Sequence, residues 1–324
     1  MNPFERVPIA RTGVGVTRLG LGCAPLGSLF TAVDEAQAYA AVERAWQLGI
    51  RYFDTAPLYG NGLSERRTGH VLAGKPRADF TLSTKVGRLL RPGGGDSQQF
   101  WAEPGDGEPV FDFSSDGVVT SYAESLARLG LERADILHIH DPDEHQAEAV
   151  TGALPALIRL RAQGRIGAVS VGMNQTKVLA ELVRTGELDC VLLAGRYSLL
   201  DQSGLDLLEL CGERGVSVIV GGVFNSGVLA DPKPGASYDY LPVDQEVLDR
   251  ALALREVCEA HGVPLRAAAV QFPLTHPAVT AVLVGARSPA EVTDAVEMAA
   301  TPVPDRLWRD LRGAGLLAGE VRSS

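Results

Sequence analysis

Short apolar runs alternate with amphipathic segments along most of the chain. The apolar runs cover residues 19–24, 50–54, 80–85, 135–140, 166–172, 190–193, 216–221 and 280–284. Each run is followed by a segment of helical periodicity, and this alternation predicts parallel strand–helix units. Eight such units predict an α/β fold of the (β/α)8 TIM-barrel type, whose active site lies at the C-terminal ends of the strands. We expect residues 1–324 to form a single barrel domain.

Helix-start and helix-stop signals support this division. Asp34 and Ser64 are predicted N-caps, and Gly49 is a predicted helix end. The helices are predicted at residues 34–48, 64–72, 116–129, 146–163, 177–184, 204–214, 244–261, 265–274, 289–299 and 306–316. A doubly wound sheet is the competing architecture. It usually carries a GxGxxG turn after its first strand, which the stretch LGLGCAPLG does not match.

Three segments fall outside the repeating pattern. Two short extended pieces in residues 7–17 predict a hairpin ahead of the barrel. Residues 86–114 and 222–243 predict long loops at the C-terminal face, and the first of them contains Trp101, Phe111 and Phe113. Loops of this length in compact domains are usually functional or disordered, and the aromatic residues favour a lid over the substrate.

Composition narrows the range of functions. The chain has 324 residues, 45% of them hydrophobic, and a formal net charge of −10, which argues against a nucleic-acid surface. Its four cysteines are scattered without metal-ligand spacing, so we expect reduced, buried thiols, no metal site and a cytoplasmic location. We see no secretory signal in MNPFERVPIA and no apolar run of membrane-spanning length.

Three predicted strands end in a polar residue. Asp54 ends the run IRYFD, Lys85 ends FTLSTK and His140 ends DILHIH. Because side chains alternate along a strand, all three can point into the barrel mouth. A buried ammonium needs a counter-charge, and Asp54 is the natural partner of Lys85. This pair can be a structural salt bridge or part of an active site, and the pattern alone leaves both readings open.

Tyr59 follows the first of these strands by one turn. A phenol has a pKa of about 10, and an ammonium beside it lowers that value. A Tyr59–Lys85 pair could then exchange a proton with a carbonyl or alcohol oxygen. His140 could orient that oxygen or be a satisfied core histidine, and we expect His138, deeper in the barrel, to be structural.

The stretches FDTAPLYG, STKVG, DILHIHDPD, GMN and VLVGARSPAEV resemble the aldo-keto reductase superfamily, in family order and over nearly the whole chain. GGVFNSGVLAD and HDPD resemble its sugar-dehydrogenase branch, which includes aldose 1-dehydrogenases and pyridoxal 4-dehydrogenase. The resemblance implies a catalytic tetrad in which Tyr59 is the acid/base and Lys85 tunes it. It further implies that Asp54 holds Lys85 and that His140 orients the substrate.

The resemblance also implies a nicotinamide dinucleotide across the barrel mouth. The cofactor-binding residues that it implies are Met173, Asn174, Tyr197, Gly222, Val223, Phe224, Asn225, Ser226, Gly227, Leu229, Gly285, Arg287, Ser288 and Glu291. Asn174 would hold the carboxamide and Tyr197 would stack on the nicotinamide ring. Met173 and Ala194 depart from the usual Ser and Gln. Arg287 suits the 2′-phosphate of NADP, but the carboxylate of Glu291 repels it, so NAD is favoured.

We therefore predict an NAD(P)-dependent oxidoreductase with a small carbonyl or sugar substrate, and an aldose 1-dehydrogenase in particular. Pyridoxal 4-dehydrogenase and a general aldehyde or ketone reductase are alternatives within the same chemistry. A Schiff-base aldolase that uses Lys85 is an alternative of another class, and a non-catalytic, cofactor-sensing subunit is a third. No pattern in the sequence indicates an oligomeric state.

Overall fold

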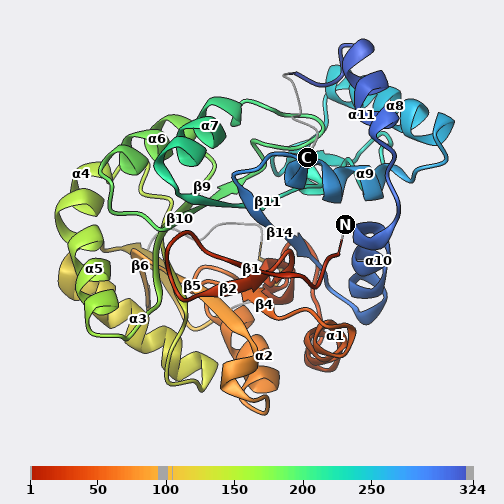
Figure 1. Cartoon of the computed structure of the whole chain (residues 1–324). Helices are drawn as coiled ribbons and strands as arrows, with labels where there is room; N and C mark the ends of the chain where they lie inside the picture. The colour runs from red at the N-terminus through yellow and green to blue at the C-terminus, as the bar shows by residue number, and fades with distance from the viewer. Residues whose placement is uncertain (1, 94–100, 104, 319–324) are drawn as a thin grey trace.

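A closed barrel of parallel strands forms the centre of the computed structural model, which describes residues 2–93, 101–103 and 105–318. In these residues the barrel has eight strands, and each pairs in parallel with the next along the chain until the last pairs with the first (Figure 1). They are β3 (Leu19–Gly22), β4 (Tyr52–Asp54), β5 (Thr81–Val86), β8 (Ile136–His140), β9 (Ala168–Met173), β10 (Cys190–Ala194), β11 (Ser217–Gly221) and β14 (Val279–Gly285). The predicted (β/α)8 fold is therefore confirmed.

Helices surround the barrel and cover the outer faces of its strands (Figure 1). They are α1 (Glu35–Leu48), α2 (Leu63–Leu72), α3 (Ser115–Leu129), α4 (Gln146–Glu148), α5 (Leu154–Ala162), α6 (Thr176–Arg184), α7 (Leu205–Arg214), α8 (Gln245–Ala260), α9 (Leu265–Gln271), α10 (Pro289–Ala300) and α11 (Asp305–Gly313). Alternate strand residues point outward and pack with the helices in one large apolar core. The other residues point into the barrel.

Two helices differ from the prediction. The segment predicted as one helix at 146–163 contains a π-helical turn, η3 (Ala149–Ala153), between α4 and α5. Ser64 is not an N-cap: α2 begins at Leu63 after Gly62, which has φ +91°. The Ser64 hydroxyl instead donates to the carbonyl of Cys23, at 2.7 Å, because the helix start lies against the end of β3. Asp34 does cap α1, since its side chain accepts from the backbone N–H of Gln37.

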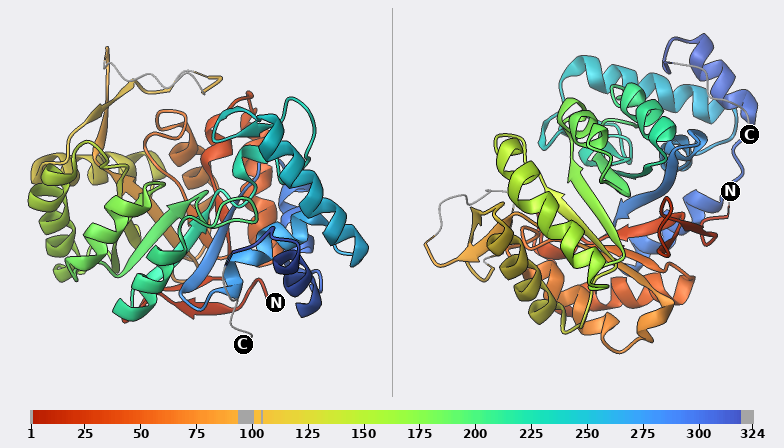
Figure 2. Two further views of the ribbon diagram at one scale, coloured as in Figure 1. Left: turned by 90° about the horizontal axis from the view of Figure 1, so that it is seen from above. Right: turned by 60° about the vertical axis from the view of Figure 1, so that its left-hand side comes forward.

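A hairpin covers the N-terminal end of the barrel, as predicted. Its strands are β1 (Arg6–Pro8) and β2 (Gly15–Thr17). Ile9 and Val16 are fully buried and pack with the lowest inward-pointing residues of the barrel, among them Ile136 and Ile219. Figure 2 (left) shows this red hairpin on one side of the barrel and the long loops on the opposite side. The barrel is thus filled from below and open at the C-terminal ends of its strands.

The two long loops contain regular structure that the sequence did not predict. The first holds the hairpin of β6 (Arg88–Arg91) and β7 (Glu108–Phe111), which projects from the barrel in Figure 2 (left). Residues 94–100 and 104 of the predicted lid lie outside the described residues. The second loop holds η4 (Asn225–Gly227) and the short pair β12 (Ser237–Tyr238) and β13 (Leu241–Pro242).

The remaining expectations concern thiols and membranes. Cys23, Cys190, Cys211 and Cys258 are all buried, and none forms a disulfide with another described residue. Among the helices that the structure describes, none is long and apolar enough to cross a bilayer.

The N-terminal hairpin should contribute measurably to stability. Replacing Ile9 with Ala removes a fully buried side chain from the floor of the barrel and leaves a cavity. We expect the free energy of unfolding to fall by about 2–4 kcal/mol, measured by urea denaturation. Val119→Ala, at a position 44% exposed on α3, is the matched control and should change stability little. A loss for Ile9→Ala no larger than that of the control would contradict a packed floor.

Candidate active site

A buried ion pair lies at the centre of the barrel mouth. The Lys85 ammonium is 2.6 Å from Asp54 Oδ2 and also donates to the backbone carbonyl of Thr55, at 2.9 Å. Lys85 is 1% exposed. The predicted partnership of these two strand-end residues is therefore present in the structure. A neighbouring carboxylate favours the protonated, non-nucleophilic form of an amine, which argues against the Schiff-base reading of Lys85.

Hydroxyl groups complete the environment of the carboxylate. Ser83 donates to Asp54 Oδ1 at 2.6 Å, and the phenol of Tyr52 lies 3.1 Å from the Ser83 oxygen. His138 is fully buried one layer below the mouth, where its Nδ1 lies 2.7 Å from the Ser170 hydroxyl. Burial first, and then the charge of Lys85, lower the pKa of His138 well below its ordinary value. His138 is thus a neutral structural residue, as expected.

Two glycines fix the turn that carries Tyr59. Gly60 has φ +61°, and its backbone lies against that of Gly27 in η1 (Ala24–Gly27). A Cβ on Gly27 would be 2.6 Å from the carbonyl carbon of Tyr59, so neither position accepts a side chain. The turn therefore holds Tyr59 beside the ion pair. The Lys85 ammonium lies 4.7 Å from the centre of the phenol ring.

The pKa of Tyr59 departs from the expected direction. We expected Lys85 to lower it, but burial and then the negative charge of Asp54 raise the pKa of Tyr59 well above its ordinary value. The physical reason is that Asp54 neutralises Lys85, whereas the surroundings of the phenol disfavour a phenolate. The phenol is therefore protonated in this state of the site.

His140 faces Tyr59 across the mouth. The two rings are edge-on, with centroids 5.9 Å apart and an interplanar angle of 87°. Arg88, the first residue of β6, lies 3.1 Å from His140 Nδ1, and both of its terminal nitrogens lie 3.2 Å from Asp141 Oδ2. Sequence reasoning missed Arg88 and Asp141. The available signals were a charged residue inside the run VGRLL and a carboxylate directly after the strand-end histidine.

Aromatic residues border the mouth. The backbone of Trp101 forms an isolated antiparallel β-bridge with that of Leu29, and the Trp101 ring centroid lies 6.1 Å from that of Tyr59. The buried Trp101 Nε1 has no hydrogen-bond partner among the described residues. On another part of the rim, the rings of Phe30 and Tyr240 are 5.9 Å apart. The long loops thus contribute Trp101 and Tyr240 to the opening, and the role of the first loop as a lid stays a prediction.

The other half of the mouth is bordered by small residues. Asp54, Lys85 and His140 come from three neighbouring strands, β4, β5 and β8. Alternation and register place small residues at the last inward positions of the remaining five strands, namely Gly22, Gly172, Ala194, Gly221 and Gly285. The mouth therefore has polar side chains on one side and small residues on the other.

Comparison with known proteins agrees with this geometry. A sequence model described as the Aldo/keto reductase family matches residues 18–315. The chain belongs to the aldo/keto reductase family. It is accordingly an oxidoreductase that acts on carbonyl or CH–OH groups, and the family uses NADH or NADPH as the hydride carrier.

Individual relatives match over almost the full length. The chain is 42% identical to D-threo-aldose 1-dehydrogenase of a Pseudomonas species, over 95% of this chain and 97% of that protein. It is 41% identical to pyridoxal 4-dehydrogenase of Microbacterium luteolum, over 97% and 98%. Among solved structures, it resembles the holo form of the aldo-keto reductase AKR11C1 from Bacillus halodurans. The TM-score is 0.77, with 26% identity and 96% of each chain covered.

The glycine-lined half of the mouth fits a nicotinamide ring in this aldo/keto reductase. A flat ring needs space beside the phenol, and four of the five positions that border this half of the mouth are glycines, on β3, β9, β11 and β14. The predicted loop after β11 begins at Gly222, which has φ +67° and is exposed. In that loop Val223, Asn225 and Leu229 are buried, whereas Phe224, Ser226 and Gly227 are partly exposed. Asn174 is half-buried directly after β9.

Two of the predicted cofactor-binding residues have buried side chains. Tyr197 is 3% exposed, stacks on Phe272 with centroids 5.1 Å apart and meets His276 edge-on. One face of the Tyr197 ring is thus covered by Phe272, and its stacking on nicotinamide stays a prediction. Met173 is the last residue of β9, where alternation points its side chain outward into the helix-facing core.

The N-terminus of α10 is occupied by an ion pair. The Arg287 guanidinium is 2.8 Å from Glu291 Oε1, and the backbone N–H of Arg287 donates to Glu291 Oε2 at 2.8 Å. Ser288 caps the helix by accepting from the backbone N–H of Glu291. Arg287 is therefore already neutralised, and a second anion would compete with Glu291 for it.

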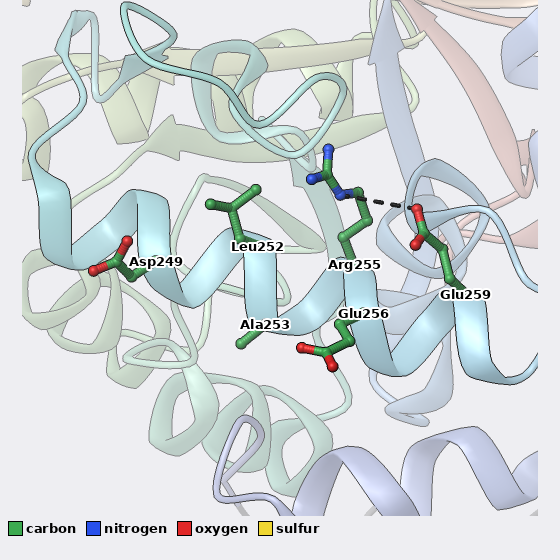
Figure 3. A pocket seen from close by; sticks show the side chains of 6 residues that line it. All are labelled: Asp249, Leu252, Ala253, Arg255, Glu256 and Glu259. Atoms are coloured by element: carbon green, nitrogen blue, oxygen red, sulfur yellow. Dashed lines mark ion pairs between the residues drawn. The ribbon is translucent and has the colours of Figure 1, made fainter.

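Other surface features lie apart from this site. A shallow hollow of about 380 Å³ is lined by six residues of α8, namely Asp249, Leu252, Ala253, Arg255, Glu256 and Glu259 (Figure 3). Because one helix supplies the whole lining, no groups converge from different elements to bind a ligand. The described residues contain no cluster of His, Cys, Asp and Glu suited to a metal ion.

The tight turn around Tyr59 can be tested directly. Gly60→Ala places a methyl group against the backbone of Gly27 and strains a positive φ. We expect at least about a tenfold loss of kcat/KM with the fold retained, because a displaced phenol loses its geometry. Gly74→Ala is the control, since a Cβ there has its nearest neighbour at 3.6 Å. Equal activity of the two variants, measured from nicotinamide absorbance, would show that the turn does not position Tyr59.

Proposed function

We propose that this aldo/keto reductase oxidises an aldose at its anomeric carbon with NAD as the hydride acceptor. The observation that carries the proposal is the convergence of Tyr59, Lys85 and His140 opposite a glycine-lined space. The 42% identity with D-threo-aldose 1-dehydrogenase supports the choice of substrate. Four buried, free thiols support a cytoplasmic location, and the single barrel that carries the whole site supports one domain.

The residues of the mouth have distinct roles in this proposal. The reacting oxygen lies between the Tyr59 hydroxyl and His140, and the bound nicotinamide supplies or accepts the hydride. Tyr59 donates its proton to that oxygen in reduction and accepts it in oxidation. Lys85 and Asp54 hold the phenol in place. Because the pKa of Tyr59 is raised, the rate of sugar oxidation should increase with pH as the phenolate becomes available.

A carboxylate beside the reacting position supports a hydroxylated substrate. Asp141 Oδ2 lies 3.5 Å from His140 Nε2, so the carboxylate borders the place where the reacting oxygen would be held. It can accept a hydrogen bond from a hydroxyl on the carbon next to the reacting one. Aldoses carry such a hydroxyl at C2, and 2-deoxy aldoses do not.

Pyridoxal is the second candidate substrate. The 41% identity with pyridoxal 4-dehydrogenase motivates it, and one feature of the rim favours it. Trp101, Phe30 and Tyr240 present aromatic rings at the opening, where a pyridine ring can stack. Pyridoxal also carries a hydroxyl next to its aldehyde-bearing carbon.

The remaining proposed contacts belong to the dinucleotide. Asn174 would bind the carboxamide, and the loop from Gly222 to Leu229 would cross the pyrophosphate. Gly285 and Ser288 adjoin the N-terminus of α10, where the helix dipole favours anions. The Arg287–Glu291 pair supports NAD over NADP, because the carboxylate can accept from ribose hydroxyls and repels a 2′-phosphate.

A substrate panel tests the proposed reaction. We expect NAD reduction with aldoses, at higher kcat/KM than with 2-deoxy aldoses or simple alcohols, measured from nicotinamide absorbance. Tyr59→Phe should reduce kcat by about 100- to 10,000-fold and leave cofactor binding intact, because it removes the transferred proton. Tyr39→Phe, on α1, is the control and should retain activity.

Other outcomes of the panel would reject the aldose proposal. Turnover of the free alcohol pyridoxine or of pyridoxal without turnover of sugars would favour the second candidate. Tight cofactor binding without turnover of any substrate would favour a cofactor-sensing subunit. Full activity of Tyr59→Phe would remove the proposed role of the phenol.

Cofactor preference can be tested at Glu291. Glu291→Gln removes the carboxylate and releases the Arg287 guanidinium for a 2′-phosphate. We expect kcat/KM for NADP to rise by about tenfold relative to that for NAD, a change of about 1.4 kcal/mol. Glu297→Gln, at an exposed position of the same helix, should leave the ratio unchanged. If both variants keep the wild-type ratio, the ion pair does not select the cofactor.

A further inference from the structure

Arg88 lies in an unusual position for a charged residue. It starts β6, directly beyond the end of β5, and is 5% exposed beside the barrel mouth. One of its terminal nitrogens lies 3.1 Å from His140 Nδ1 and 3.2 Å from Asp141 Oδ2, and its other terminal nitrogen is also 3.2 Å from Asp141 Oδ2. Arg88 thus joins the mouth histidine and the adjacent carboxylate.

The chemistry of a guanidinium restricts what His140 can be. Arginine has N–H donors and no acceptor, and it keeps its charge in proteins. A ring nitrogen that contacts it at hydrogen-bond distance must therefore be an acceptor without a proton. His140 Nδ1 is that nitrogen. A neutral imidazole with an unprotonated Nδ1 carries its hydrogen on Nε2.

We propose that Arg88 is a positioning residue that fixes His140 as the neutral Nε2–H tautomer, so that His140 offers one hydrogen-bond donor to the reacting oxygen. This inference rests on the proposed function in one respect, namely that the reacting oxygen lies between Tyr59 and His140. His140 is then a donor that stabilises charge on the oxygen, and Tyr59 alone exchanges the proton.

The surroundings hold the guanidinium in this orientation. The face of Arg88 packs on the Phe111 ring, 4.8 Å from its centre, and β7 pairs Phe111 with Arg88 in the hairpin. The Ser121 hydroxyl of α3 donates to the Arg88 carbonyl at 3.0 Å. Asp141 balances the charge of Arg88. Its Oδ2 lies 3.5 Å from His140 Nε2 but makes no hydrogen bond with it. Arg88 therefore has little freedom to turn away from His140.

Nearby charges reinforce the neutral ring. Burial and then the charge of Arg88 lower the pKa of His140 well below its ordinary value. The charged and titratable groups that face it are Arg88 on β6, Lys85 on β5, His138 on the same strand, Asp141 at the end of that strand and Tyr59 from the turn after β4. Most of these disfavour a second proton on the ring, and Arg88 also decides which nitrogen carries the first.

The tautomer can be read by NMR of the protein labelled with ¹⁵N in its six histidines. Two-bond proton–nitrogen correlations distinguish the two neutral tautomers, and the spectrum of His140→Asn assigns the His140 signals by their absence. We expect an Nε2–H ring for His140 that does not titrate between pH 6 and pH 9. A proton on Nδ1, or a charged ring at neutral pH, would overturn the proposal without any variant of Arg88.

Variants separate positioning from packing. Arg88→Met keeps the length and apolar stem but removes the donors, so we expect mixed His140 tautomers and about a 10- to 100-fold lower kcat. KM should change less than kcat, because the donor acts on charge that develops in the reaction. An acid limb should also appear in the pH profile as His140 becomes protonatable. Arg88→Lys retains a donor and should recover the Nε2–H tautomer and part of the rate.

Two controls make the result decisive. Arg91 is on the same strand as Arg88 and pairs with Glu124 of α3. Arg91→Met removes this ion pair and should change neither the His140 tautomer nor kcat. The double variant Arg88→Met with Asp141→Asn leaves no unpaired, half-buried carboxylate and should show the same mixed tautomers as Arg88→Met. If Arg88→Met keeps a pure Nε2–H ring and wild-type kcat, the proposal is wrong. A failure of the aldose panel would leave the NMR result unchanged, so the two proposals can fail separately.

Discussion

The buried ammonium of Lys85 requires a counter-charge and hydrogen-bond acceptors at the C-terminal end of the barrel. Lys85 lies inside the protein, where a charge is stable only if a counter-charge and further hydrogen bonds replace water. Asp54 supplies the charge, Ser83 supports that carboxylate, and the Thr55 carbonyl accepts a second ammonium proton. Removing one partner of such a pair typically costs about 3–5 kcal/mol. The arrangement that holds the phenol of Tyr59 is therefore also one that the fold needs for its own stability.

Much of the architecture could be predicted because it depends on short-range patterns. The eight apolar runs each bury one face against helices and one face in the barrel, so their spacing alone indicated the closed sheet. Strand alternation likewise placed Asp54, Lys85 and His140 at one opening. Ser64 shows where local patterns fail: a serine near a helix start usually caps it, but here a tertiary contact with the Cys23 carbonyl takes its hydroxyl.

The features that sequence reasoning missed depend on contacts between distant segments. The pKa of Tyr59 is raised because Asp54 cancels the ammonium and the phenol is enclosed, a balance that pair-wise reasoning from Tyr59 and Lys85 could not include. Tyr197 is enclosed by Phe272 and His276, which follow it by about 75 residues or more along the chain. Arg88 reaches His140 through a hairpin in a segment predicted to be irregular.

The floor formed by the N-terminal hairpin has a kinetic consequence. Since Ile9 and Val16 fill the lower end, a dinucleotide and a carbonyl or alcohol substrate would enter and leave by the same opening. The nicotinamide would lie beside the small residues of the mouth, and the substrate would then cover it from outside. Under this arrangement the dinucleotide would bind before the substrate and dissociate after the product. Its release would then be a candidate for the rate-limiting step of each catalytic cycle.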